Sequence, residues 1–353
     1  MSEMKEMILD VVERMLQDNV TKDVVDILED GKWSKDVWAL LEENGMVAVA
    51  VAEENGGAGG DLEDLLNIVR LTGKYAAPIP FTETTLANFL LEKADLKIVD
   101  HVATYHFDTD NLLTLENNAL SGTIQNIPWA RYASNLVTFV KDGDAIRLAV
   151  VDLQTGMIAP SGNLASEPRD TVTFQSVPIQ QLSAPLTKEQ IYYAKTVETA
   201  FKLALMTGAI EKVNALTVQY TKEREQFGRP IHRFQLVQQH IVHLVGEAVI
   251  AMAAFNNVCE ALQTNQFLHE VAYARIRFED AITTVATVAH QVHAAIGTTH
   301  EHSLHQYTRR LWSWRDEGIR SDFWSEEVAN YLLEANEDNL WAYLTKSADY
   351  IKI

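Results

Sequence analysis

Side chains suited to ligand binding gather in the stretch Tyr220–His240, which reads YTKEREQFGRPIHRFQLVQQH. Arg224 and Phe227 stand there directly before Gly228, whose backbone can end a helix, and Pro230, which suits the start of the next one. We expect a helix–helix corner that presents both side chains. A guanidinium beside a planar ring suits a ligand with a phosphate and a flat ring. The alternative is an ordinary capped turn with Phe227 in the core.

A second cluster is rich in histidine. Five histidines fall within sixteen residues near the C-terminus: His290, His293, His300, His302 and His305. A zinc site would need ligands grouped on one helix face together with a fitting fourth ligand, such as Glu301. The spacing fits no compact ligand set, so we expect structural histidines and no metal.

Two more segments stand in order around these clusters, ENGMVAVAVAEENGGAGGDLEDLL near the N-terminus and HQVHAAIGTTHEHSLHQYTRR near the C-terminus. With YxxxREQFGRPIxxFQxxQH, they resemble the acyl-CoA dehydrogenase family of flavoproteins. The resemblance covers almost the whole chain and is most specific at 220–240. It implies an oxidoreductase of fatty acid metabolism. In this family a carboxylate takes a proton from the α-carbon of an acyl-CoA thioester, and a hydride passes from the β-carbon to N5 of FAD.

The resemblance also implies which residues hold FAD. Arg224 would pair with the pyrophosphate, and the second turn would serve the flavin of a neighbouring subunit. The implied contacts are Gln226 and Phe227 on the adenosine side, Ile231 and Gln235 one helical turn on, and Gln291 and Gly297 in the second turn. Ala294-Ala295 stands where the family usually has Gly-Gly, so the added methyl groups either narrow the site or mark a weakened one.

The family places its catalytic carboxylate in one of two positions, and this sequence has a candidate for each. Glu198 lies 26 residues before Arg224, as in the type that carries the base on the first helix of the C-terminal domain. Glu317-Gly318 resembles the Glu-Gly pair of the other type, although it stands one residue out of register and lacks the following Thr. Both remain candidates, and so does a site with neither.

The middle of the chain departs most from the family. No segment matches the Thr/Ser-Glu-Pro-x-x-Gly-Ser stretch that holds the flavin ring. Three readings therefore stay open: an FAD-dependent acyl-CoA dehydrogenase, a half-site subunit that pairs with a homologous chain, and a flavin oxidase or monooxygenase on the same fold. We expect an acyl-CoA substrate and a homo-oligomer, dimer or tetramer, unless the partner is such a homologous subunit. We also expect an electron acceptor such as an electron-transfer flavoprotein.

Periodicity predicts the elements that position these residues. Apolar residues recur at helical spacing over 1–95, with Asp61 a good N-cap after the glycine-rich loop 54–60. Short β-rich runs fill 96–183 and predict a small antiparallel β domain. Long amphipathic segments at 189–223, 231–263, 266–296 and 322–345 make 184–353 helical. The fold class is α+β, mostly helical. The resemblance implies an N-terminal helical domain, a central β domain and a C-terminal four-helix bundle.

Composition narrows the function further. The 353 residues carry 29 basic and 49 acidic side chains, a net charge of −20, which argues against nucleic-acid binding. No apolar run of about eighteen residues occurs, so we expect no membrane-spanning helix. The first six residues are charged and lack a signal-peptide core. With a single cysteine, Cys259, no intrachain disulfide can form, and a cytoplasmic protein fits best.

Overall fold

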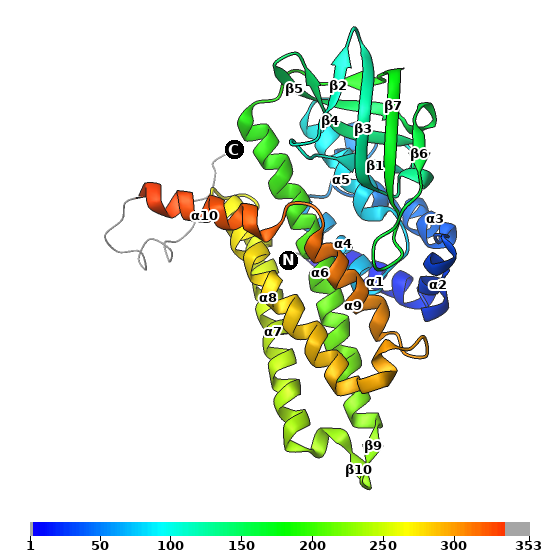
Figure 1. Cartoon of the computed structure of the whole chain (residues 1–353), viewed down its shortest axis with the longest axis vertical. Coiled ribbons are helices and arrows are strands. Elements are labelled where there is room, and N and C mark those ends of the chain that lie inside the picture. The colour runs from blue at the N-terminus through cyan, green and yellow to red at the C-terminus, as the bar shows by residue number, and fades with distance from the viewer. Residues whose placement is uncertain (1–2, 336–353) are drawn as a thin grey trace. The chain divides into compact units, whose positions relative to one another are not determined.

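The structure, a computed structural model, describes residues 3–335. These form two compact units, one of residues 3–72 and 76–201 and the other of residues 73–75 and 202–335. The chain passes through helices, then a sheet, then helices again, as the sequence predicts (Figure 1). The division into three domains at residues 95 and 183 stays a prediction.

The first unit begins with five helices joined by short turns. They are α1 Glu3–Asn19, α2 Lys22–Asp26, α3 Lys35–Glu43, α4 Leu62–Lys74 and α5 Phe81–Lys93. Asp61 caps α4 as predicted, because its Oδ1 accepts from Asp64 N at 3.0 Å while Asp64 Oδ2 accepts from Asp61 N at 3.1 Å. Helix α5 is buried on every side along most of its length.

The glycine-rich loop 54–60 folds back on the residues before it. Gly59 N donates to Val51 O at 2.9 Å and Gly60 N donates to Val49 O at 2.8 Å. A Cβ on Gly60 would meet Val49 O at 2.7 Å, so the two stretches of chain touch through backbone atoms. These amides are already used within the chain and are not free to hold a phosphate, so the loop is a connection, as expected from the sequence.

An eight-stranded sheet follows in the same unit. Its strands are β1 Ala103–His106, β2 Leu113–Glu116, β3 Ala119–Pro128, β4 Asn135–Asp142, β5 Ala145–Asp152, β6 Met157–Ala159, β7 Arg169–Pro178 and β8 Gln181–Leu182. The order is β6-β7-β3-β2-β4-β5-β8, and β1 also pairs with β4. The prediction of an antiparallel domain is wrong in one respect, because β1 and β2 both run parallel to β4. Leu120, Leu136 and Phe174 lie in its core.

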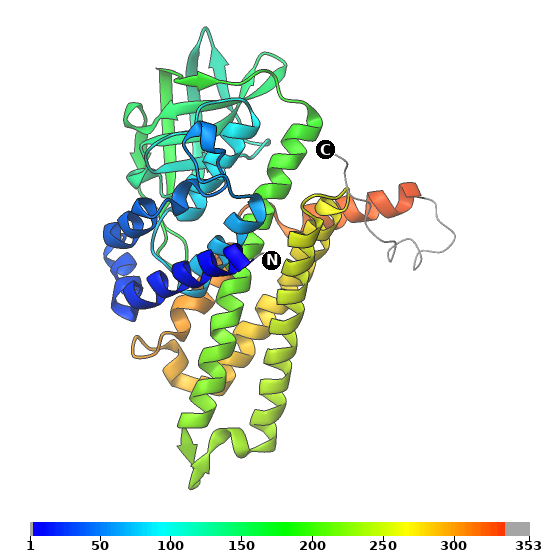
Figure 2. The ribbon, with the colours of Figure 1, turned by 180° about the vertical axis from the view of Figure 1, so that it is seen from behind.

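The second unit is helical. It contains the end of α6 Lys188–Glu223, then α7 Gln235–Ala261, α8 Phe267–His293, α9 Leu304–Asp316 and α10 Ser321–Ala335. Helix α8 packs against α7, α9 and α10 (Figures 1 and 2). The predicted segments at 189–223, 231–263 and 266–296 match helices within a few residues. Helix α9 was not predicted separately, and the segment 322–345 lies partly outside the described residues.

Helix α7 differs from the sequence expectation in its hydropathy. Among residues 3–335 it is the one helix long and apolar enough to cross a membrane, judged by length and composition alone. The sequence did not suggest this, because His243, Glu247 and other polar residues interrupt any unbroken apolar run. One side of α7 is packed, through Leu244, Phe255 and Val258. The helix therefore has a buried face and an exposed apolar face.

Candidate functional site

A two-residue β-hairpin stands between α6 and α7. Strand β9, Glu225–Gln226, pairs with β10, Arg229–Pro230, and the pair lies at the far end of these two helices (Figures 1 and 2). The turn residues Phe227 and Gly228 both have positive φ, 54° and 77°, as a tight hairpin turn of the primed type requires. The predicted direct corner is therefore wrong in form, because Gly228 closes a hairpin rather than ending α6.

The hairpin does present its side chains, as the sequence predicts. Phe227 is 93% exposed, so the alternative that placed this ring in the core is wrong. The guanidinium of Arg224 is exposed and makes no hydrogen bond or ion pair with residues 3–335. Gln226 and Gln235 are exposed too, and Ile231 is half-buried.

The hairpin is preformed by contacts of its own. Ile231 N donates to Arg224 O at 2.9 Å, which closes the loop around it. The Arg229 guanidinium lies over the Phe234 ring at 4.3 Å, and the Phe227 ring meets that ring edge-on at 6.1 Å. The exposed groups therefore lie on a backbone that needs no ligand to hold its shape.

The second predicted turn follows α8. Gln291 is exposed near the helix end, and Gly297 is buried in the turn Ala294–Thr298. A Cβ on Gly297 would lie 2.9 Å from His293 Cβ, so this position accepts only glycine without a shift. Ala294 has φ 53° and ψ −141°, a conformation that favours glycine. The alanine thus adopts a backbone conformation that glycine would adopt with less strain.

Ring contacts bring the two turns to the same end of the helical unit. The Tyr220 ring, one helical turn before Arg224, stacks on His293 with ring centroids 4.4 Å apart. His302 meets both rings edge-on. His293 is 1% exposed, and its Nδ1 donates to Ala289 O at 2.8 Å. Burial lowers the pKa of His293 to about 4, so the ring is neutral at physiological pH.

The two candidate bases belong to different units. Glu198 lies on α6 and is 7% exposed, although the sequence alone favours a solvated position for a lone glutamate on a helix. Glu317 lies in the connection between α9 and α10 and is half-buried. Its Oε2 accepts a hydrogen bond from Lys202 Nζ at 3.1 Å, which forms an ion pair.

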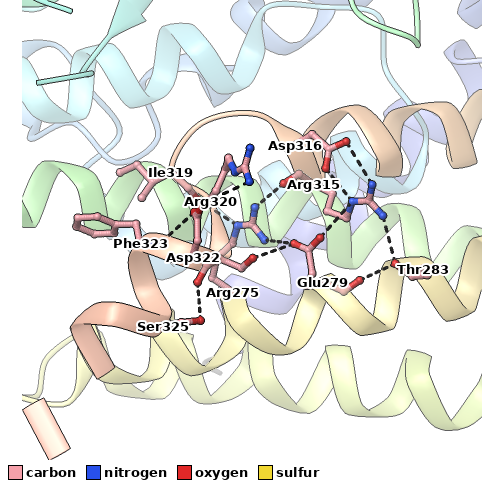
Figure 3. A network of polar contacts seen from close by, with 11 residues as sticks. Arg275, Glu279, Thr283, Arg315, Asp316, Ile319, Arg320, Asp322, Phe323 and Ser325 are labelled. Atoms are coloured by element: carbon pink, nitrogen blue, oxygen red, sulfur yellow. Dashed lines mark hydrogen bonds and ion pairs between the residues drawn. The ribbon is translucent and has the colours of Figure 1, made fainter. Parts of the chain in front are cut away.

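Sequence reasoning missed the residues that surround Glu317. Lys202 on α6 is 7% exposed, and Arg275 on α8 is 1% exposed. Figure 3 shows Arg275 and Arg315 around Glu279, beside the chain that leads to Ile319. The available signals were cations within apolar runs of predicted helices, Lys202 in AFKLALM and Arg275 in VAYARIRF.

A small apolar cavity in the first unit was also missed. Its volume is about 350 Å³. It is lined mainly by Leu90, Phe139, Leu148, Leu186, Tyr193 and Ala194. Ala194 precedes Glu198 by one turn of α6, although Glu198 itself does not line the cavity. Its lining comes from α5, the sheet and the start of α6, elements far apart in the sequence.

The residues present fit the phosphate and adenosine half of a dinucleotide. A cation with no partner in residues 3–335, two exposed amides and an exposed ring lie on the β9–β10 hairpin and on the chain directly before and after it. The fit is tighter at the second turn, where the methyl groups of Ala294 and Ala295 are exposed. In the β domain, Trp129 is 3% exposed and packs against Tyr132, so it is a packed aromatic.

Comparisons with known proteins agree with this geometry. The family model for the acyl-CoA dehydrogenase N-terminal domain matches residues 2–93, and that for the C-terminal domain matches residues 196–314. Acyl-CoA dehydrogenase IpdE2 of Mycobacterium tuberculosis is 30% identical over 285 residues, 80% of this chain and 81% of that protein.

Solved structures share the fold. Butyryl-CoA dehydrogenase from Megasphaera elsdenii has a TM-score of 0.84 at 16% identity, covering 94% of this chain and 99% of its own. The ChsE4–ChsE5 complex from Mycobacterium tuberculosis has a TM-score of 0.81 at 17% identity, covering 95% and 98%. The chain belongs to the acyl-CoA dehydrogenase family of FAD-dependent oxidoreductases.

Proposed function

We propose that this protein catalyses the FAD-dependent α,β-dehydrogenation of an acyl-CoA thioester. The observation that carries the proposal is the exposed hairpin beside the Arg224 guanidinium, which has no partner within residues 3–335, at the same end of the helical unit as the second turn. That arrangement supports a dinucleotide site shared between chains. Membership in the acyl-CoA dehydrogenase family supports the reaction class.

The chain's own residues would bind and orient the cofactor. Arg224 would donate paired hydrogen bonds to the pyrophosphate, as a planar guanidinium does to phosphate. The adenosine side would lie against Gln226, Phe227, Ile231 and Gln235, and Gln291 and Gly297 would belong to the site of a neighbouring chain. FAD, when bound, supplies the acceptor for the β-hydrogen, which no protein side chain can provide.

A carboxylate screened from water would take the α-proton. Glu198 meets that condition on a buried face of α6, and Glu317 meets it in part, because it is half-buried in a short connection. A carboxylate in a dry site is a better base than an exposed one. The apolar cavity one helical turn before Glu198 supports that residue as the base, and the hydrogen bond from Lys202, which holds the Glu317 carboxylate in place, supports Glu317.

Two variants decide between these bases. If Glu198 is the base, Glu198→Gln keeps bound flavin but abolishes its reduction by acyl-CoA, a loss of about 10²–10⁴ in rate. Glu317→Gln is its control, and the result reverses if Glu317 is the base. The measurement is the bleaching of the flavin absorption band in stopped flow. Normal reduction in both variants would remove both residues from the chemistry.

A second function is favoured by one observation. Ala294, at a backbone angle that suits glycine, places a methyl group in the turn expected to approach a flavin. This supports a half-site subunit that completes its flavin site with a homologous chain. Among the proteins that share the fold, ChsE4 and ChsE5 of Mycobacterium tuberculosis form a complex with each other. Flavin bound per chain, measured on the protein alone, separates the two functions: one per chain supports the enzyme, and none supports the half-site subunit.

The proposed reaction also implies an electron acceptor and a cellular location. We propose a cytoplasmic protein that delivers its electrons to an electron-transfer flavoprotein. Helix α7 does not oppose this, because one side packs on α8 and Glu247 forms an ion pair with Arg277. A helix with a partly buried ion pair of this kind suits a protein neighbour better than lipid.

A further inference from the structure

Arg275 makes a buried contact with the connection that carries Glu317. Its Nε donates to Ile319 O at 3.2 Å, and one terminal nitrogen donates to Arg315 O (Figure 3). These two carbonyls stand on either side of Glu317, two residues before it and two residues after it. One guanidinium therefore holds both ends of the segment.

The segment has little freedom between those contacts. Helix α9 ends at Asp316 and α10 begins at Ser321, so four residues join them. Gly318 has φ 63°, which makes the sharp turn. Glu279 reinforces the arrangement from α8, because it pairs with Arg275 at 3.5 Å and accepts from Ser321 Oγ at 3.1 Å.

Further contacts fix the same segment from both sides. Arg315 pairs with Glu279 at 3.5 Å and with Asp316 at 2.9 Å. Lys202 approaches from α6 and holds the Glu317 carboxylate itself. The backbone is thus held by Arg275 and the side chain by Lys202, both within the helical unit.

We propose that Arg275 is the positioning residue for Glu317 and sets the place of its carboxylate. This rests on Glu317 being the base in the proposed function. Arg275 has five N–H donors in a fixed plane, so it can serve two carbonyls at once. A methionine of similar length would leave both carbonyls without that donor and let the segment move. A shift of about 1 Å at a reacting group can cost about a hundredfold in rate.

The test compares Arg275→Met with Arg277→Met, a matched control on the same helix. Arg277 pairs with Glu247 and Asp280, and within the described part of the chain no hydrogen bond or ion pair joins it to residues 317–320. We expect amide hydrogen exchange at residues 317–320 to rise in Arg275→Met and to stay unchanged in Arg277→Met. This readout needs neither flavin nor substrate. Arg275→Lys keeps the charge but reaches one carbonyl, so it should give an intermediate exchange rate.

The rate of flavin reduction then tests whether Arg275 acts through Glu317. Arg275→Met should slow flavin reduction about tenfold to a hundredfold with little change in the substrate concentration for half-saturation. In a Glu317→Gln background the same change should add no further loss. An equal loss in both backgrounds would show a general structural role and overturn the proposal.

The two variants separate the role of Glu317 as the base from the role of Arg275 in positioning it. If Glu317→Gln reduces flavin at the parental rate, the base assignment fails and this inference fails with it. If Glu317→Gln is inactive while Arg275→Met keeps parental exchange and rate, Glu317 stays the base and only the role of Arg275 is overturned. If Arg275→Met does not fold, Arg275→Lys carries the same comparison.

Discussion

At the residue scale, Arg224 offers the sharpest test of the cofactor site. We predict that Arg224→Ala lowers FAD affinity, because a charged hydrogen bond to phosphate contributes about 1.5–3 kcal/mol, or roughly 10- to 150-fold in Kd. The ratio of flavin to protein after dialysis, followed by titration with FAD, measures it. Lys222→Ala is the control, since it removes a nearby exposed cation. Equal flavin content in the two variants would take Arg224 out of the site.

The buried ring of His293 predicts a pH dependence of stability. Burial lowers its pKa from 6.5 to about 4, so the unfolded chain binds a proton at a pH where the folded chain does not. The free energy of unfolding should therefore hold above pH 6.5 and fall as the pH drops from 6.5 to 4. The slope for one such group is at most about 1.4 kcal/mol per pH unit.

Urea unfolding between pH 7 and 4 tests this prediction. His293→Gln should flatten the slope, while His243→Gln, on an exposed position of α7, should leave it as in the parent. Burial also lowers the pKa of His290 and His302, so some slope should remain in the variant. A parental slope in His293→Gln would show that this ring does not titrate during unfolding.

The sequence predicts exposed ligand groups better than it predicts their buried supports. Arg224 and Phe227 could be recognised because glycine and proline punctuate the chain beside them. The contacts of Lys202 with Glu317 and of Arg275 with Ile319 could not be predicted, because the partners lie 115 and 44 residues away. Local sequence patterns do not predict contacts between residues so far apart in the chain.

At the element scale, the helices could be predicted from local sequence, whereas the pairing of the strands could not. Helical periodicity located α6, α7 and α8 to within a few residues, because each has a continuous buried face. The parallel pairing of β1 and β2 with β4 joins segments that are distant in the sequence, and no turn signal encodes it. The β9–β10 hairpin was missed because its two-residue strands are too short to show alternation.

The turn after α8 supplies a prediction at this scale. Alanine at φ 53° and ψ −141° is strained by about 1–3 kcal/mol, a cost that glycine avoids. Glycine loses about 0.5–1 kcal/mol more backbone entropy on folding. We predict that Ala294→Gly raises the free energy of unfolding by about 1 kcal/mol, measured by urea denaturation. Ala295→Gly, next to it and at a position whose φ is not positive, should be neutral or destabilising.

At the scale of the whole molecule, exposed apolar surface is concentrated on α7. Its large exposed apolar side chains are Leu236, Val242, Val249 and Ile250. Val242 and Val249 stand seven residues apart, and the small residues Gly246 and Ala253 repeat the same interval between and after them. A stripe of this kind suits close packing against another helix. Among the described residues, this apolar stripe and the exposed hairpin are the two surfaces best suited to contact with a second chain.

We therefore predict that the protein is at least a dimer, and that the exposed face of α7 contributes to its contact. Val242→Asp with Val249→Asp would bury two charges in that contact, so the assembly should dissociate and lose flavin if the second turn serves a neighbour's site. Val11→Asp, at a half-exposed valine of α1, is the matched control. Light scattering and the flavin ratio are the measurements. A parent that is monomeric with full flavin would refute the shared site, and an intact oligomer in the double variant would move the contact away from α7.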